Sequence, residues 1–426
     1  MPLANSLSPI TETRWREIAE AGLKSGELGG LSSRSEDGFT IAPIYSRAVG
    51  PRPFRTGGPW RVVARVDHPD ARQANDSALD DLSNGADGLQ LIFAGAGGAY
   101  GYGLARWDDA ALRDCLEGVD LDAGLSIDCD LGPPAYEQAL AIAALIARTS
   151  HSVEKVDLSF GLDPLGALAR SGRAEAPWSE MAKAMARTAV ALRELGFASP
   201  LVVVDGRCVH DASGSPAQEL GYALACAIDY LRALTDQGMT LEAARDAIAF
   251  RLAADCDEYI CLSKFRALRL LWARALEACD LAPNQALVHG ATAWRMMSAR
   301  DPWMNVMRGA LAAFCAGLGG ADSVSVLAFT QAIGLPDAFA RRLARNAQLV
   351  MLEESHLGFV ADPVAGSGAF EALTGELSAK AWALFQAIEA QGGVHAALAA
   401  AAIQAEVSKT AAAARAAWTP PCASIA

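Results

Sequence analysis

An alternation of apolar runs and helical stretches, repeated eight times from Trp60 onward, limits the fold more than any other feature of this chain. Continuous apolar strands that alternate with helices form parallel sheets with helices on their faces. Eight such units predict an α/β fold, a (β/α)8 TIM barrel over residues 60–335, with a doubly wound open sheet as the alternative. The eight runs are Arg61–Val66, Leu89–Phe93, Leu125–Cys129, Val156–Phe160, Leu201–Asp205, Ala247–Leu252, Ala286–Gly290 and Ser323–Ala328.

The stretches between and after the runs carry helical periodicity. After Pro177, mostly hydrophobic residues recur at alternating steps of four and three positions, which predicts one buried face of a helix. The residues of this stripe are Met181, Met185, Thr188, Leu192 and Leu195. Residues 336–426 follow the last strand and are expected to form a C-terminal helical segment and tail. The other expected helices are Ala217–Leu234, Glu258–Cys279, Met304–Leu318, Asp337–Glu354, Thr374–Gln391 and His395–Trp418.

The first 59 residues cannot form a core of their own. They contain closely spaced glycine and proline residues, and only Glu12–Lys24 has a helical pattern. A segment of this kind gains buried area by lying across another surface. We therefore predict that residues 1–59 form an extended N-terminal arm that contacts a partner.

The composition argues against a nucleic-acid-binding, an exported or a membrane-spanning protein. The 426 residues include 36 Lys and Arg against 49 Asp and Glu, a formal net charge of −13. Nucleic-acid binding needs clustered positive charge, so no nucleic-acid partner is expected. The start of the chain lacks an export signal, and the longest apolar run, Ala139–Ala147, is far shorter than a membrane span. Nine scattered cysteines without CxxC pairs indicate reduced thiols, and these features together predict a cytoplasmic protein outside the membrane.

Polar residues near the ends of the predicted strands are the candidate site residues, because chemistry in a TIM barrel sits where strands end. His289 lies in an apolar strand, where a hydrogen-bonded core histidine and a catalytic histidine both fit the pattern. His210 and Cys208 match no zinc spacing, and adjacent residues on an extended segment point in opposite directions, so no metal site is predicted. The whole set is Arg65, Asp67, His68, Asp128, Asp130, Asp205, Arg207, Cys208, His210, Asp211 and His289.

Two further patterns each allow two interpretations. The glycine-rich loop Ala94–Gly103 could cradle a phosphate, but Tyr100 stands where the third glycine of GxGxxG would be. A plain flexible loop is therefore predicted. Lys264, Arg266 and Arg269 share one helix but not one face, which predicts solvated helix charges, with binding of an anionic group as the alternative.

Longer motifs carry a resemblance to a known family. In their order and spacing they resemble the barrel half of the methylmalonyl-CoA mutase family over residues 60–393. The resemblance implies a barrel that binds acyl-CoA along its axis and holds adenosylcobalamin against a separate flavodoxin-like domain. It also implies a radical rearrangement, typically of (R)-methylmalonyl-CoA to succinyl-CoA. The motifs are Ser263–Ala273, Asp301–Arg308, Ala328-Phe329 leading to Gly334-Leu335-Pro336 and Ala344-Arg345-Asn346, and Asp362–Gly368.

The chain departs from this family's pattern where the cofactor is concerned. The family's cobalt-ligating motif Asp-x-His-x-x-Gly does not occur, because Asp205-Gly206-Arg207 and His210 do not fit it. No cobalamin-binding flavodoxin-like domain and no metal ligand are therefore expected in this chain. Adenosylcobalamin is expected only at the level of a complex, bound mainly by the partner.

The barrel positions depart from the family's pattern as well. The family's Tyr-Ala-Gly on the first strand corresponds to Arg65-Val66-Asp67, and its Gly-Tyr-His turn corresponds to Gly206-Arg207-Cys208. Its Thr-Ile-Gln-Asn-Asp corresponds to residues 159–163. A radical enzyme needs close contacts that position the substrate and exclude water, so Arg65, Arg207 and Cys208 are degenerate positions and no catalytic residue is assigned. The substrate-pocket candidates are His289, Thr292, Lys264, Arg266 and Ser159.

This pattern of losses resembles the small subunit of heterodimeric methylmalonyl-CoA mutases, and the run Gly161–Leu168 is similar to that subunit in particular. The resemblance implies a non-catalytic subunit, inactive alone, that stabilises a catalytic large subunit in a heterodimer. Two alternatives stay open at this point. One is the substrate-barrel subunit of a split acyl-CoA mutase that takes cobalamin from a separate protein, and the other is a free-standing regulatory barrel.

Overall fold

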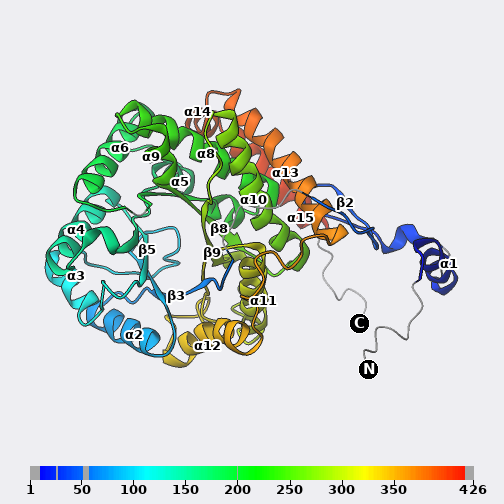
Figure 1. The fold of residues 1–426 in the computed structure, drawn as a ribbon, viewed down its shortest axis with the longest axis horizontal. Coiled ribbons are helices and arrows are strands. Elements are labelled where there is room, and N and C mark those ends of the chain that lie inside the picture. Colours follow the sequence, from blue (N-terminus) through cyan, green and yellow to red (C-terminus); the bar gives the residue numbers. More distant parts are fainter. Residues whose placement is uncertain (1–9, 25–26, 51–56, 199, 418–426) are drawn as a thin grey trace.

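The computed structural model describes residues 10–24, 27–50, 57–198 and 200–417, and its centre is a parallel sheet curved into a barrel (Figure 1). The strand order is β6-β5-β4-β3-β10-β9-β8-β7, and a parallel bridge between Leu162 and Val202 joins the two ends of the sheet. All eight predicted strands and the predicted TIM-barrel fold are confirmed. The strands are β3 (Arg61–Val66), β4 (Gly88–Ile92), β5 (Ser126–Asp130), β6 (Asp157–Ser159), β7 (Val202–Asp205), β8 (Ile248–Ala254), β9 (Leu287–Thr292) and β10 (Ser323–Ser325).

Helices surround the barrel, and most of them begin at a side chain that caps the first turn. Asp70, Asp257 and Asp337 each accept hydrogen bonds from backbone amides of the helix that follows, which satisfies donors that lack a partner within the helix. These helices are α2 (Ala71–Ser83), α3 (Asp109–Leu116), α4 (Ala135–Thr149), α5 (Pro164–Ser171), α6 (Trp178–Glu194), α7 (Arg207–Asp211), α8 (Pro216–Asp236), α9 (Leu241–Asp246), α10 (Glu258–Ala278), α11 (Met304–Gly319) and α12 (Ala338–Leu349).

The predicted stripe on α6 is confirmed only in part. Met185, Thr188 and Leu192 are buried, but Leu195 is 46% exposed. Helix α6 ends at Glu194, so Leu195 lies at its C-cap and no longer follows the buried face. Short 3-10 turns occur at η3 (Val153–Lys155) and η4 (Trp294–Met296).

The C-terminal segment is helical, as expected, but its last helix is divided. Helix α13 (Gly368–Glu389) packs along α8 and α10, where a side chain at Gly221 would come within about 3.0 Å of the Ala381 carbonyl. The single helix predicted from His395 is interrupted, because Ala401 has a left-handed φ of 55° between α14 (Val394–Ala399) and α15 (Ala402–Ala417). The predicted end at Trp418 lies outside the described residues. A π-helical turn, η5 (Val350–Glu354), extends α12.

The N-terminal residues leave the barrel on one side, where Figure 1 shows α1 (Glu12–Gly22) at the outer end of the chain path. A 3-10 turn, η2 (Leu28–Leu31), leads to a hairpin of β1 (Ser33–Arg34) and β2 (Thr40–Ile41), which the sequence did not predict. Residues 1–9, 25–26 and 51–56 of the predicted arm lie outside the described residues. Within the described residues, no helix has the length and apolar character needed to cross a membrane.

Candidate functional site

The interior of the barrel is charged rather than apolar. Successive strand residues point alternately inward and outward, so Ile127 and Cys129 of β5 join the hydrophobic core while Asp128 and Asp130 lie on the other face. Layers of branched apolar side chains fill the interior of most TIM barrels. Here several strand positions carry buried charged residues instead. They are Arg65, Asp128, Asp130, Asp205 and Arg251.

Guanidinium and carboxylate groups pair across this interior. The Arg251 Nη2 atom lies 2.5 Å from Asp128 Oδ1. The Arg207 Nη2 atom lies 2.7 Å from Asp130 Oδ2 and 2.6 Å from Asp205 Oδ2. Each of these side chains is at most 5% exposed. We call Arg207, Arg251, Asp128, Asp130 and Asp205 the barrel ion network.

The guanidinium groups of the network lower the pKa of two of its carboxyl groups, those of Asp130 and Asp205. Burial by itself would raise the pKa of Asp130, but the Arg207 and Arg251 guanidinium groups outweigh burial and hold that pKa below its usual value. The pKa of Asp205 is lowered in the same way, mainly by Arg207. Opening the network would leave buried charges without partners, which costs about 3–5 kcal/mol for each pair broken.

The glycine-rich loop 94–103 covers the network at the carboxyl ends of the strands. Arg65 Nη2 donates to the Gly98 carbonyl at 2.7 Å, and the Gly98 amide donates to Asp130 Oδ2 at 3.0 Å. A Cβ atom at Gly98 would lie 2.4 Å from Asp130 Oδ2 and 2.5 Å from Arg207 Nη1, so any other residue here would displace the Asp130–Arg207 ion pair. The Tyr100 ring stacks on Trp294 with centroids 4.4 Å apart. The prediction of a plain flexible loop is therefore wrong, because this loop is bonded to the barrel interior.

A pocket of about 610 Å³ opens beside this loop, between α4, α5 and α6. Its inner end reaches Asp130, Asp205 and Arg251 of the network. Arg170 from α5 also lines it and lies 3.5 Å from Asp205 Oδ2. The pocket therefore lies between these helices and the carboxyl ends of β5 and β7, and it reaches the network.

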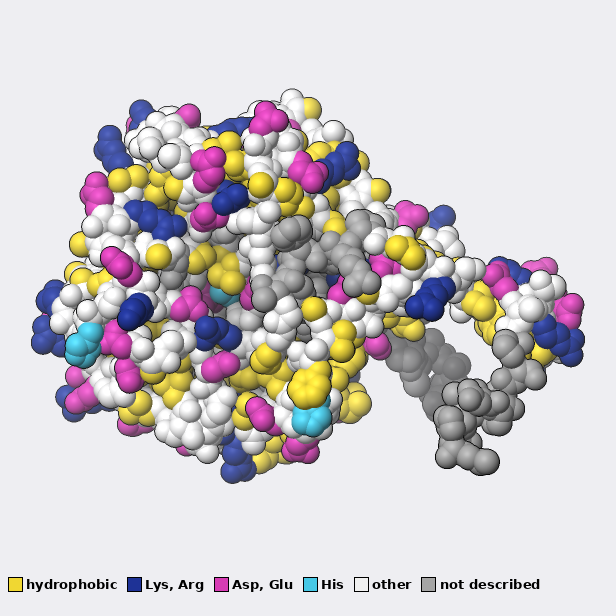
Figure 2. Space-filling model, viewed as in Figure 1, with side chains coloured by type: hydrophobic (Ala, Val, Ile, Leu, Met, Phe, Trp, Pro, Cys, Tyr) yellow, Lys and Arg dark blue, Asp and Glu magenta, His cyan; other side chains and the backbone are white. Residues whose placement is uncertain are grey.

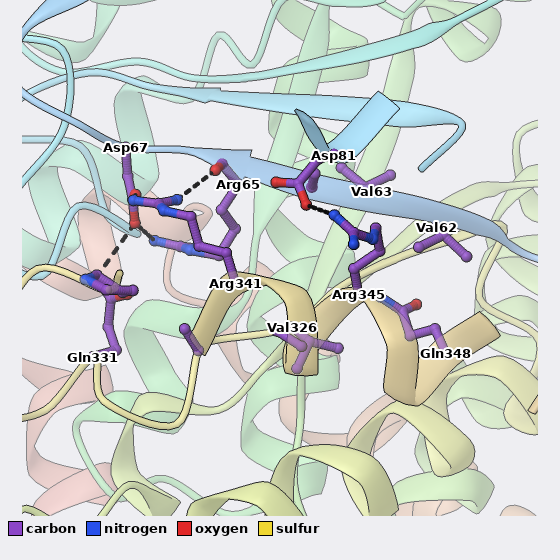
Figure 3. Close-up of a pocket in the computed structure, with 14 residues that line it drawn as sticks. Val62, Val63, Arg65, Asp67, Asp81, Val326, Gln331, Arg341, Arg345 and Gln348 are labelled. Atoms are coloured by element: carbon purple, nitrogen blue, oxygen red, sulfur yellow. Dashed lines mark hydrogen bonds and ion pairs between the residues drawn. The ribbon is translucent and has the colours of Figure 1, made fainter. Parts of the chain in front are cut away.

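A second, much smaller cavity of about 20 Å³ lies between β3 and α12 (Figure 3). Arg341 Nη2 lies 2.7 Å from Asp67 Oδ1, and Arg345 Nη1 lies 2.5 Å from Asp81 Oδ1. Gln331 also donates to Asp67, at 3.4 Å. The space left holds little more than a water molecule, so these ion pairs attach α12 to the barrel and do not form a ligand site.

The three basic residues of α10 are buried, so their interpretation as solvated helix charges is wrong. Lys264 Nζ lies 2.5 Å from Glu219 Oε2 and also donates to the Ala253 carbonyl. Arg266 pairs with Asp362 and Glu371, and Arg269 pairs with Asp322. Because α10 lies between the barrel and α13, both sides of the helix are covered.

The remaining predicted pocket residues lie at different depths in the barrel. The His289 Nδ1 atom lies 2.6 Å from Ser323 Oγ, and burial lowers the pKa of His289. Thr292 Oγ1 accepts a hydrogen bond from the Leu327 amide at 2.7 Å. Ser159 is buried on β6 beside Asp128 in the sheet register. The structure thus brings Ser159 and His289 to the barrel interior and places Arg266 against α13, away from the interior. The five substrate-pocket candidates stay predictions as substrate contacts.

The turn after β7 is a short helix, α7, and not the extended segment on which the sequence argument against a metal site relied. The His210 Nε2 atom lies 3.1 Å from Asp255 Oδ2, and burial lowers the pKa of His210. Cys208 Sγ donates to the Asp205 carbonyl, and burial raises the pKa of this thiol to about 12. A neutral thiol of this kind is a poor nucleophile and a poor metal ligand.

Cobalamin fits these residues poorly. An axial cobalt ligand must present an accessible imidazole nitrogen, but His210 is 1% exposed and lies between Asp255 and Glu219. Loop 94–103, which includes Tyr100, covers the network at the carboxyl ends of the strands. We therefore derive no chemical step through this cofactor on this chain.

Sequence reasoning missed Arg251, Gln90 and Arg170. Arg251 interrupts an otherwise apolar strand, and this signal was available. Gln90 Nε2 donates to Asp128 Oδ2 at 2.8 Å, but a single polar residue in an apolar run gave no sign of that contact. Arg170 lies on a helix, and only the fold brings it to the ends of the strands.

Comparisons with known proteins agree with the motifs. The methylmalonyl-CoA mutase family model matches residues 28–419. The methylmalonyl-CoA mutase small subunit of Streptomyces virginiae is 37% identical, over 93% of this chain and 66% of its own length. The probable small subunit of Mycobacterium bovis is 37% identical (89% and 65%), and the small subunit of Propionibacterium freudenreichii subsp. shermanii is 32% identical (92% and 64%). This chain thus spans slightly less than two thirds of these relatives. The length of the family match and these identities show that the chain belongs to the methylmalonyl-CoA mutase family.

Proposed function

We propose that this chain is the non-catalytic small subunit of an adenosylcobalamin-dependent methylmalonyl-CoA mutase, an isomerase that interconverts (R)-methylmalonyl-CoA and succinyl-CoA. Its partner is a catalytic large subunit, with which it forms a heterodimer. This chain stabilises the large subunit, and the large subunit makes most of the contacts to the cofactor. Three relatives that are named as small subunits of this enzyme support the proposal.

The single observation that carries the non-catalytic role is the barrel ion network. An acyl-CoA that ran along the barrel axis would have to displace Arg207 and Arg251 from Asp128, Asp130 and Asp205. Each carboxylate of the network is already paired with a guanidinium group. A substrate that separated these buried pairs would leave charges without partners, which is costly.

The arm supports the partner contact. Helix α1 buries none of its residues against the barrel, and an isolated helix of 11 residues is marginal in water. A partner surface would supply the missing burial. The domain division that follows is an arm over residues 1–59, a barrel over residues 60–335 and a helical segment over residues 336–426.

The complex works in the cytoplasm under this proposal. The eight described cysteines are all free thiols, which suits a reducing compartment, whereas the ninth, Cys422, lies outside the described residues. On the face shown in Figure 2, Lys and Arg side chains are interspersed with Asp and Glu side chains and do not gather into a basic patch. This surface suits a protein partner better than a nucleic acid.

Co-expression with the large subunit tests the proposal. We expect the two chains to co-purify, and the pair to convert methylmalonyl-CoA in the presence of adenosylcobalamin. This chain alone should show no turnover under the same conditions. Turnover by this chain alone, or failure of the two chains to associate, would contradict the proposed function.

A further inference from the structure

The hairpin of the arm presents two acidic residues in a fixed turn. Strands β1 and β2 pair through Ser33 with Ile41 and Arg34 with Thr40. The Ser35 amide donates to the Phe39 carbonyl, and the Gly38 amide donates to the Ser35 carbonyl, both at 3.0 Å. Glu36 and Asp37 therefore occupy the tip of a short, closed turn.

Asp37 contacts the first turn of α8, the 21-residue helix that follows the turn after β7. The Ser215 hydroxyl donates to Asp37 Oδ1, and the Ala217 amide donates to Asp37 Oδ2 at 3.2 Å. Ser215 is the N-cap of α8 and also accepts from the Gln218 amide. The first amides of a helix lack partners within it, so the Asp37 carboxyl group from the arm satisfies the Ala217 amide.

Glu36 adds a second contact, to Arg295 in η4. Arg295 Nη2 lies 3.4 Å from Glu36 Oε2, and Arg295 Nη1 donates to the Gly214 carbonyl at 3.2 Å. Arg295 also pairs with Asp255 after β8. Three loops of the barrel therefore meet at this point. Glu36 is 41% exposed on its side chain, so its ion pair contributes much less than the contacts of Asp37.

The segments before and after the hairpin differ in their contacts with the barrel. After the hairpin, the Ala48 amide donates to the Gly366 carbonyl before α13, which holds the chain against the barrel. Before the hairpin, α1 buries no residue, and Glu12 Oε2 accepts a hydrogen bond from the Ser46 hydroxyl at 3.1 Å. The turn at Glu36 and Asp37 is where the hairpin contacts α8 and η4.

We propose that Asp37 is the positioning residue of the arm: its contact with α8 fixes the direction in which α1 leaves the barrel and so aligns the arm for the partner chain. The partner in this inference rests on the proposed function, but the contact between Asp37 and α8 does not. A segment that is ordered before binding loses less conformational freedom when it binds, so the contact should appear in the affinity for the partner.

Hydrogen exchange and partner affinity together test this inference on the full chain. The variants are Asp37→Ala and Asp37→Asn, with Asp76→Asn, an exposed residue of α2, as the charge-matched control. In Asp37→Ala we expect amide exchange in residues 33–41 to rise about tenfold or more while exchange in β3–β10 stays unchanged. The affinity for the large subunit should fall about tenfold, and Asp37→Asn should lie between Asp37→Ala and the control.

Each result decides one step. Exchange in residues 33–41 of Asp37→Ala equal to that of the Asp76→Asn control would overturn the contact as an anchor. Faster exchange with unchanged affinity would overturn the positioning role. If the wild-type chain bound no large subunit at all, the proposed function would fail, while the exchange data would still decide whether Asp37 holds the arm.

Discussion

At the scale of single residues, the charged side chains of the barrel interior pair with one another. Arg65 and Arg207 stand where the family resemblance expects the tyrosines of the Tyr-Ala-Gly and Gly-Tyr-His motifs, and both guanidinium groups bind neighbouring carboxylates or carbonyls. The carboxylates Asp130 and Asp205 were visible in the sequence as polar residues at strand ends. Their pairing with Arg207 could not be predicted, because it depends on side chains of β5, of β7 and of the first residue of α7 meeting in the folded barrel.

Removing Arg207 tests how much this pairing stabilises the fold. Arg207→Ala leaves Asp130 and Asp205 buried with one guanidinium fewer, so we expect the free energy of unfolding to fall by about 3–5 kcal/mol in urea denaturation. Arg72→Ala is the matched control, because the Arg72 pair with Asp114 is largely exposed and should contribute less than about 1 kcal/mol. Equal losses in the two variants would show that the network does not stabilise the barrel.

At the scale of elements, the repeating strands were predictable and the irregular segments were not. Strands such as β8 are buried over their whole length and apolar apart from Arg251, because helices cover the parallel sheet, and this leaves a clear pattern in the sequence. The hairpin β1–β2 has only two residues in each strand, too few for any periodicity. The break at Ala401 lies in an alanine-rich stretch where local propensity favours a continuous helix, so tertiary packing sets the break.

Helix α5 gives a pH-dependent prediction through its N-cap, Asp163. Asp163 Oδ1 accepts hydrogen bonds from the Gly166 amide and from the Tyr230 hydroxyl, and burial raises the pKa of Asp163 to about 6. A raised pKa means that the folded chain holds the proton more tightly than the unfolded chain does. The stability from this group is therefore present below about pH 4 and is lost as the pH rises through about 6.

Asp163→Asn removes this titration and keeps an acceptor for Gly166 and Tyr230. Between pH 4 and pH 7, the stability of the variant relative to the wild type should rise by roughly 3 kcal/mol, from about two pKa units at 1.36 kcal/mol each. Urea denaturation of both proteins across this range measures the difference. A difference that stays constant with pH would mean that Asp163 does not titrate in this range.

At the scale of the whole molecule, the chain keeps the barrel of the methylmalonyl-CoA mutase family, and an ion network of its own side chains occupies part of the interior. The fold and the family could be predicted from the sequence, because the eight repeats and the long motifs are properties of the chain alone. The network could not be predicted, since loop 94–103 and the side chains of Arg207 and Asp130 come together only in the folded barrel. The candidates Lys264 and Arg266 likewise bind Glu219, Asp362 and Glu371, partners that lie far from them in the sequence.

The central claim is that the barrel ion network closes this barrel to an acyl-CoA, and calorimetric titration of the purified chain with methylmalonyl-CoA tests it most directly. We expect no saturable heat of binding for the chain alone, and saturable binding when the same titration is repeated on its complex with the large subunit. Saturable binding to the chain alone would contradict the account and would favour a barrel that receives substrate itself.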